Sequence, residues 1–298
     1  MDNDQRCNDQ HGHGHAHDHD QAQAQAHVHD SDFDWEAMAD HLELEATMLL
    51  PMVDEIIRVH TPHVDWPAVH RVLDLGSGPG IITCALAEHA PAAQVTALDT
   101  SVPLLNRARA HAATHDLARR VHTMEADMEA VLPALRPMDV IWTGMVLHHV
   151  ADPAAVLGGL RNLLQRGGTL VMIEFAGRPT ALPENDPVVG AWTRMEAAVF
   201  GGIAARLGRD PLTIDWPTLL AAAGFRDVSD HTLVAMHPAP LTAPARDWLT
   251  AHLRRSVEWT ADEIGADDAA TLTELAAQVA TRDDLFVRAE RRVLIARR

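Results

Sequence analysis

The sequence has 298 residues, of which 47% are hydrophobic, and a formal net charge of −18 from 42 acidic and 24 basic residues. This length and apolar content can bury one large core or two small ones. The acidic balance argues against nucleic acid, because a polyanion would be repelled at long range. We see no apolar run of the roughly 18 residues that a membrane span needs, no leader pattern and no cysteine framework, and we expect a cytoplasmic protein without a membrane contact.

Residues 1–32 form a low-complexity segment with alternating histidines between His11 and His29. Nothing in it can build a core, so we expect a disordered tail. Imidazole binds zinc, nickel and copper, so the tail is a candidate for adventitious binding of divalent metal. The alternative is a solvated repeat without a metal role. We assign no catalytic metal, because a flexible tail fixes no coordination geometry.

Residues 33–66 follow as a helical segment with apolar residues at helical spacing. Pro51 is expected to break or kink this helix, because proline removes a backbone donor. We expect the segment to act as a lid over a ligand site, with Trp35, Met38, His41 and Leu42 as candidate lining residues. The alternative is that these side chains only pack.

The stretch Val72–Gly80, VLDLGSGPG, joins an apolar strand to three closely spaced glycines. Residues Ile81–Ala90 then read as a helix. Strand, glycine-rich turn and helix form the first unit of a doubly wound α/β fold, in which ligands bind at the carboxyl ends of the strands. The spacing is GxGxG, whereas a dinucleotide fingerprint is GxGxxG.

Four further strand segments follow, most of them ending in polar residues. Residues Gln94–Ser101 end a strand at Asp99, and a carboxylate about 20 residues past a glycine-rich turn can accept both hydroxyls of a ribose. Residues 121–130 place Asp127 at the end of a third strand. Met138–Pro153 contains a fourth strand, and Arg161–Gly177 reads as a helix, a Gly-Gly turn and a fifth strand.

The remainder predicts two more strands and two helical insertions. The sixth strand is expected near Asp227–Met236 and the last over Arg288–Ala296. Helices at about 186–208 and 243–283 would both lie at the ligand-binding edge, and we interpret them as a substrate cap. The large apolar residues of these insertions are candidates for the pocket or for the core: Trp192, Met195, Phe200, Trp248 and Trp259.

This ordered set of motifs resembles the class I S-adenosylmethionine-dependent methyltransferases, closely over Val72–Gly177. The resemblance implies a Rossmann-like, doubly wound seven-stranded sheet with an antiparallel last strand, a helical lid and helical caps. The methyltransferase domain would cover 67–298, with its core at 71–177. S-adenosylmethionine would be the cofactor and S-adenosylhomocysteine the product. The residues implied to bind the cofactor are Asp74, Gly76, Ser77, Gly78, Gly80, Asp99, Thr100, Asp127, Met128, Thr143, Gly144 and Met145.

The resemblance implies methyl transfer to a small molecule, for which a secondary metabolite is our expectation. Such transfer depends mainly on proximity and orientation, and a base is needed only if the acceptor loses a proton. His148, His149 and Glu174 are the candidates. Histidine suits the role because it titrates near neutral pH, and adjacent residues on a helix point about 100° apart, so only one of the two histidines can face the methyl group; His148 is preferred. The acceptor atom and the oligomeric state stay open, a homodimer included.

Two other functions stay open. One is a nicotinamide-dependent oxidoreductase, against which the GxGxG spacing and the lack of any Tyr-Lys pair argue, since the sequence has neither residue. The other is a non-catalytic protein that binds a cofactor or buffers metal through the histidine-rich tail. The sequence shows no metal-ligand cluster in the predicted domain, so no catalytic metal is expected.

Overall fold

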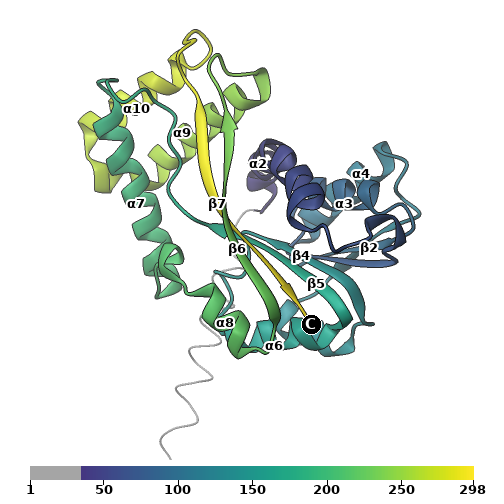
Figure 1. Ribbon diagram of the computed structural model, residues 1–298. Coiled ribbons are helices and arrows are strands. Elements are labelled where there is room, and N and C mark those ends of the chain that lie inside the picture. Colours follow the sequence, from purple (N-terminus) through teal and green to yellow (C-terminus); the bar gives the residue numbers. More distant parts are fainter. Residues whose placement is uncertain (1–34) are drawn as a thin grey trace, which may run out of the picture.

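The computed structural model describes residues 35–298, and the predicted histidine-rich tail therefore lies outside the described residues. The centre is one seven-stranded sheet in the order β3-β2-β1-β4-β5-β7-β6 (Figure 1). The strands are β1 Arg71–Leu75, β2 Gln94–Asp99, β3 Val121–Glu125, β4 Met138–Gly144, β5 Leu164–Phe175, β6 Arg226–His237 and β7 Val287–Arg297.

Helices precede the sheet, alternate with its strands and extend beyond it. The α-helices are α2 Trp35–Glu55, α3 Ile81–His89, α4 Val102–Thr114, α5 Met128–Val131, α6 Pro153–Leu163, α7 Val189–Leu207, α8 Trp216–Ala222, α9 Ala243–Ile264 and α10 Ala266–Gln278. Short helical turns are η1 Ile56–His60, η2 Trp66–Ala68, η3 Leu132–Ala134 and η4 Pro211–Thr213. Within residues 35–298, no helix combines the length and the apolarity that crossing a bilayer would require.

Strands β1 to β5 pair in parallel, and β7 runs antiparallel to both β5 and β6. This confirms the predicted fold class, including the antiparallel last strand. The strand order reverses between β1 and β4, because β2 and β3 continue on one side of β1 and β4 and β5 on the other. Doubly wound sheets bind ligands in the crevice at the carboxyl ends of the strands on either side of such a reversal.

The two faces of the sheet bury different helices. Val72 contributes to a core that includes Leu86 of α3 and residues of α2. Its neighbour Leu73 points to the opposite face and packs in a second core with Leu160 of α6 and Trp216 of α8. Alternation along each strand therefore produces a three-layer sandwich, since successive side chains of a strand face opposite sides.

A third core lies outside the sheet and holds the cap together. It joins residues of α7, α9 and α10 to Met48 of α2, and α2 also packs on α9. Figure 1 shows the cap helices gathered around the ends of β6 and β7 that project from the sheet. The expected lid and the expected cap are thus in direct contact. Of the apolar cap residues named from the sequence, only Trp259 is exposed, at 50%.

Two local expectations differ from the structure. Helix α2 continues through Pro51 to Glu55 before a π-helical turn at Ile56–His60. Burial of Met52 and Val53 next to the proline supplies packing that offsets the roughly 3 kcal/mol cost of proline inside a helix. The predicted Gly-Gly turn is instead part of β5, where Gly167 has φ +81° and the pairing with β4 is irregular.

Candidate active site

The glycine-rich corner after β1 is bound to the end of β2. The backbone N–H groups of Gly76 and Ser77 donate to the carbonyl of Leu98 at 2.8 and 3.0 Å. The N–H of Gly78 donates to Oδ2 of Asp99 at 2.8 Å, while Oδ1 of Asp99 accepts from the N–H of Ser101 at 2.9 Å. The predicted carboxylate therefore lies at the predicted corner, half-buried and held by two backbone donors.

Each of the three glycines of the corner, Gly76, Gly78 and Gly80, meets different surroundings at the position where a Cβ would lie. A Cβ on Gly76 would lie 2.3 Å from Cγ2 of Val146, and one on Gly80 would lie 2.4 Å from Cβ of Ala108. These two glycines allow the loop after β4 and helix α4 to pack closely. Gly78, with φ +53°, has no atom within 4 Å of its Cβ position. Only this glycine presents open space to a ligand.

Asp74 is a buried carboxylate below the corner. It is 3% exposed, and the hydroxyl of Thr83 donates to its Oδ2 at 2.5 Å. Burial is the main cause that raises the pKa of Asp74, the Thr83 hydrogen bond opposes it, and the charge of Asp99 adds to it, so that the resulting pKa is about 7. A cationic group beside Asp74 would favour the ionised form, since opposite charge lowers a carboxyl pKa.

Two buried hydroxyls near the strand reversal have no hydrogen-bond partner among the described residues. They are Oγ of Ser77 and Oγ1 of Thr143. Thr143 is aligned with Leu75 across the β1–β4 pair, immediately before the corner. Buried polar atoms are nearly always hydrogen-bonded, so this pair marks a place where a polar ligand can complete the bonding.

The exit of β4 carries an unusual backbone. Met145 follows Gly144 and has φ +59°, a left-handed conformation that is uncommon for residues other than glycine. Its N–H donates to the carbonyl of Ile173 at 2.8 Å, which anchors the turn to β5. Strained backbone of this kind clusters at functional sites.

Thr100, another of the residues implied to bind the cofactor, follows Asp99 at the end of β2 and is exposed.

Asp127 and Met128, two of the residues implied to bind the cofactor, lie between the end of β3 and the start of α5. Asp127 is the N-cap of this short helix, and its Oδ1 accepts from the N–H of Glu129 at 2.8 Å. Met128 is half-buried against the core on the α6 side. The N–H of Ala126 donates to the carbonyl of Asp99 at 3.1 Å, which ties this turn to the end of β2.

His148 and Glu174 form a buried pair beside the corner. Nδ1 of His148 lies 2.6 Å from Oε2 of Glu174, and the two side chains are 3% and 1% exposed. Oε1 of Glu174 accepts from the N–H of Leu147 at 2.9 Å. The carboxylate at the end of β5 therefore fixes both the backbone and the imidazole of the loop after β4. A proton on Nδ1 leaves Nε2 of His148 as the basic nitrogen.

His149 lies against the ring of His148, tilted by 40°, and makes no hydrogen bond to Glu174 among those found in residues 35–298. The two imidazole centroids are 4.1 Å apart, but His149 is exposed whereas His148 is buried. Partial desolvation, followed by the charges of His148, Arg206 and Arg209, lowers the pKa of His149. The neutral form is therefore favoured.

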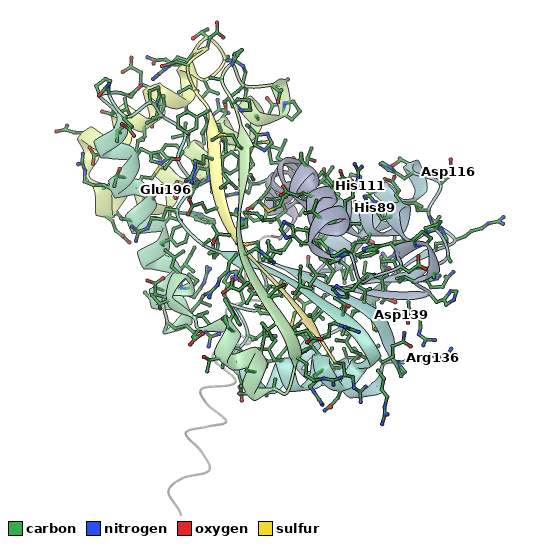
Figure 2. All side chains as sticks on the ribbon, in the orientation of Figure 1. His89, His111, Asp116, Arg136, Asp139 and Glu196 are labelled. Carbon is green, nitrogen blue, oxygen red and sulfur yellow. The ribbon has the colours of Figure 1, made fainter. Side chains whose placement is uncertain are left out.

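The sequence analysis did not identify Arg209, which follows α7 and donates hydrogen bonds to the loop after β4. Its guanidinium donates to the carbonyls of His148 at 3.1 Å and Ala151 at 3.4 Å, and also to that of Val150. An arginine in a connecting segment carries no local signal of such a role, because its partners are backbone atoms about 60 residues away. Asp139, labelled in Figure 2, is structural by contrast. Its Oδ2 accepts from the N–H groups of His70 and Arg71 at the start of β1.

A sheet whose strand order reverses at a glycine corner flanked by carboxylates defines a nucleoside-cofactor-binding α/β protein. Comparison with known proteins narrows the class. A family described as a methyltransferase domain matches residues 69–223. The chain belongs to this family, the class I S-adenosylmethionine-dependent methyltransferases, and S-adenosylmethionine is the cofactor of that family.

Individual relatives agree on the class. The trans-aconitate 2-methyltransferase of Azoarcus sp. is 31% identical over 68% of this chain and 65% of its own length. The ubiquinone biosynthesis O-methyltransferase of Xylella fastidiosa is 39% identical over 34% of this chain and 39% of its own. This chain therefore spans less than two thirds of these relatives.

A solved structure shows the same fold at low identity. It is the phosphoethanolamine N-methyltransferase 2 of Haemonchus contortus with phosphomonomethylethanolamine and S-adenosylhomocysteine. The TM-score is 0.52 at 15% identity, covering 88% of this chain and 58% of that one.

The residues at the corner fit the family's cofactor. The unpartnered hydroxyls of Ser77 and Thr143, the open side of Gly78 and the two carboxylates offer hydrogen bonds and negative charge to a cationic nucleoside. No group of three or more metal-ligating side chains exists within residues 35–298.

Proposed function

We propose that the protein transfers the methyl group of S-adenosylmethionine to a small-molecule acceptor, a secondary metabolite in our interpretation. The observation that carries this proposal is the carboxylate of Asp99 bound to the N–H of Gly78 at 2.8 Å, beside the open side of that glycine. When bound, the cofactor supplies a methyl group activated by a sulfonium. The chain then contributes binding, orientation and exclusion of water.

Residue roles follow from this placement. Asp74, Ser77 and Gly78 would hold the amino-acid end of the cofactor, with the charge of Asp74 meeting its ammonium. Asp99 and Thr100 would hold the ribose, and Asp127 with Met128 the adenine. Gly76 and Gly80 shape the corner. Thr143, Gly144 and Met145 would border the reacting centre.

For an acceptor that loses a proton, His148 is the proposed base. Glu174 would act as a positioning residue: it accepts from Nδ1 of His148 and leaves Nε2 to take the proton. The 2.6 Å contact and the burial of both groups support this division. His149, exposed and held neutral by its surroundings, would pack against the base rather than share its role.

Relatives support a small-molecule acceptor. Their names specify trans-aconitate as a substrate and ubiquinone biosynthesis as a pathway. Helices α7, α9 and α10 form a separate core that also includes Met48 of α2, and we propose that the acceptor binds under these helices. A nicotinamide oxidoreductase gains no support from these relatives.

Calorimetric titration with S-adenosylmethionine and S-adenosylhomocysteine tests the cofactor site. Asp99→Asn keeps the shape of the side chain but removes its charge, so we expect affinity to fall about 10- to 100-fold, as for lost charge-assisted hydrogen bonds. Asp262→Asn on the exposed face of α9 is the matched control. Equal affinity of the Asp99 variant and wild type would reject the assignment, and tighter binding of NADH would favour the oxidoreductase.

A further inference from the structure

A second group of charged and polar residues lies between the lid and the cap. Helix α2 contributes His41 and Glu45, α7 contributes Glu196, α9 contributes His252 and Arg255, and β7 contributes Arg291. We call these six residues the cap cluster. Nε2 of His252 lies 2.6 Å from Oε1 of Glu196, and the guanidinium of Arg291 lies 3.2 Å from Glu45. Figure 2 shows Glu196 on α7 within the cap.

Aromatic stacking connects the cap cluster into one unit. The indole of Trp248 stacks on the imidazole of His252, with centroids 4.8 Å apart and planes 10° apart. The ring of His41 lies 6.4 Å from the same indole. The charges are also coupled, because Arg255 and Glu45 both act on the pKa of His41, which burial lowers to about 3. His41 is therefore neutral near pH 7.

The hydrogen bonding of this unit is incomplete. Five buried atoms in it have no partner among the described residues: Nδ1 of His41, Oε2 of Glu196, Nε1 of Trp248, Nε of Arg255 and Nε of Arg291. All but Arg255 belong to residues that are less than a tenth exposed. Three of the five atoms are obligate N–H donors, and one is a carboxylate oxygen. The deficit is therefore mainly one of acceptors.

Arg255 contributes one of these five atoms and also has no ion pair within residues 35–298. No carboxylate of residues 35–298 lies within salt-bridge distance of its guanidinium, whose contacts are Sδ of Met38 at 4.0 Å and the ring of Trp259 at 5.1 Å. Burial lowers the pKa of Arg255, and Glu45 and Glu196 offset this only through longer-range attraction. A half-buried guanidinium without an ion pair is costly unless an anion reaches it.

The cap cluster is next to the proposed base. Arg291 lies over the ring of Phe175 at 5.6 Å, and the same ring lies 4.9 Å from the imidazole of His148. Phe175 ends β5 directly after Glu174. One phenyl ring therefore separates Arg291 of the cap cluster from the imidazole of His148.

From this geometry we propose that the cap cluster is the acceptor-binding subsite and that Arg255, with Trp248, recognises a carboxylate of the methyl acceptor. A planar guanidinium pairs with a planar carboxylate. A monoanion suits the site better than a phosphate dianion, because Glu45 and Glu196 already place negative charge there. The inference rests on the proposed function and names the class of its substrate.

Binding of paired probes to the enzyme saturated with S-adenosylhomocysteine tests this subsite. The probes are the monocarboxylates benzoate and cinnamate, each compared with its amide by calorimetry. We expect at least one acid to bind ten or more times more tightly than its amide. Arg255→Met should remove this preference, Arg255→Lys should restore part of it, and Arg254→Met, at the exposed neighbour, should leave it unchanged.

The outcomes separate the two proposals. Three outcomes would each overturn the carboxylate subsite. The acids could bind no more tightly than their amides, no acid could bind at all, or Arg255→Met could keep the preference for acids while its melting temperature stays at the wild-type value. If S-adenosylhomocysteine itself does not bind, the proposed function fails first. Trp248→Phe removes one N–H and keeps the stacked ring, so a loss of acid preference in that variant supports recognition over a merely structural role.

Discussion

The carboxylate of Glu174 and the imidazole of His148 are joined by a 2.6 Å hydrogen bond that connects the end of β5 to the loop after β4. Both groups are buried, and the same carboxylate also accepts from the backbone of Leu147. A buried carboxylate with two donors is well compensated, because hydrogen bonds to charged groups are stronger than neutral ones. The carboxylate of Glu174 therefore holds the imidazole of His148 rigidly at Nδ1.

Replacing Glu174 by glutamine should separate positioning from binding. The variant keeps the shape of the side chain but loses the charge that orients His148, so we expect kcat to fall about 100-fold, the lower end of the range of acid–base contributions. The KM for S-adenosylmethionine should stay near the wild-type value. Steady-state kinetics with labelled cofactor and an acceptor found by screening provide the measurement. Glu258→Gln on the exposed face of α9 is the control, and a change in KM alone would contradict the assigned role.

The raised pKa of Asp74 predicts a pH-dependent stability. The folded protein holds this proton up to a pKa of about 7, whereas an unfolded aspartate releases it near 3.8. The free energy of unfolding therefore loses a contribution as pH rises from about 4 to 7, since the folded state binds more protons in that range. Asp74→Asn should remove this loss, so that the variant gains up to about 4 kcal/mol relative to wild type between pH 4 and pH 8.

Urea unfolding of both proteins without cofactor at several pH values measures this difference. Cofactor affinity should change in the opposite sense in wild type, rising between pH 6 and 8 as Asp74 ionises to meet the cofactor's ammonium, and should be flat in the variant. A stability difference that does not vary with pH would show that Asp74 is ionised throughout.

Two glycines of the corner should respond differently to alanine. Gly80→Ala places a Cβ 2.4 Å from Ala108, so we expect the free energy of unfolding to fall by about 2–4 kcal/mol from overpacking and left-handed strain. Gly78→Ala meets no atom and should lose only about 1–2 kcal/mol, but its methyl group enters the open side of the corner. Its affinity for S-adenosylmethionine should fall at least about tenfold. Denaturant titration and calorimetry distinguish the two, and unchanged affinity of Gly78→Ala would place the cofactor elsewhere.

Local pattern was sufficient to predict a parallel α/β sheet. The apolar run of β1, the glycines after it and the helix that follows are short-range signals of a βα unit, and their repetition predicts a parallel sheet. Likewise Gly224, with φ +84°, follows the end of α8, where glycine is common because it adopts a left-handed backbone without strain. The resemblance added the antiparallel last strand and the order of the site residues. These features are readable because each depends on neighbours in the chain.

Partners of buried charges depend instead on packing. Glu174 meets His148 across 26 residues, and Glu196 meets His252 across 56. Arg255 is left without a carboxylate partner among residues 35–298 only because of how α9 lies against α2. No short-range pattern specifies such pairs, because any acid and base could pair and only the packing of the elements decides which two side chains come into contact. The sequence thus determined the cofactor corner, whereas the tertiary structure decided the support of His148 and the unpaired polar cluster of the cap.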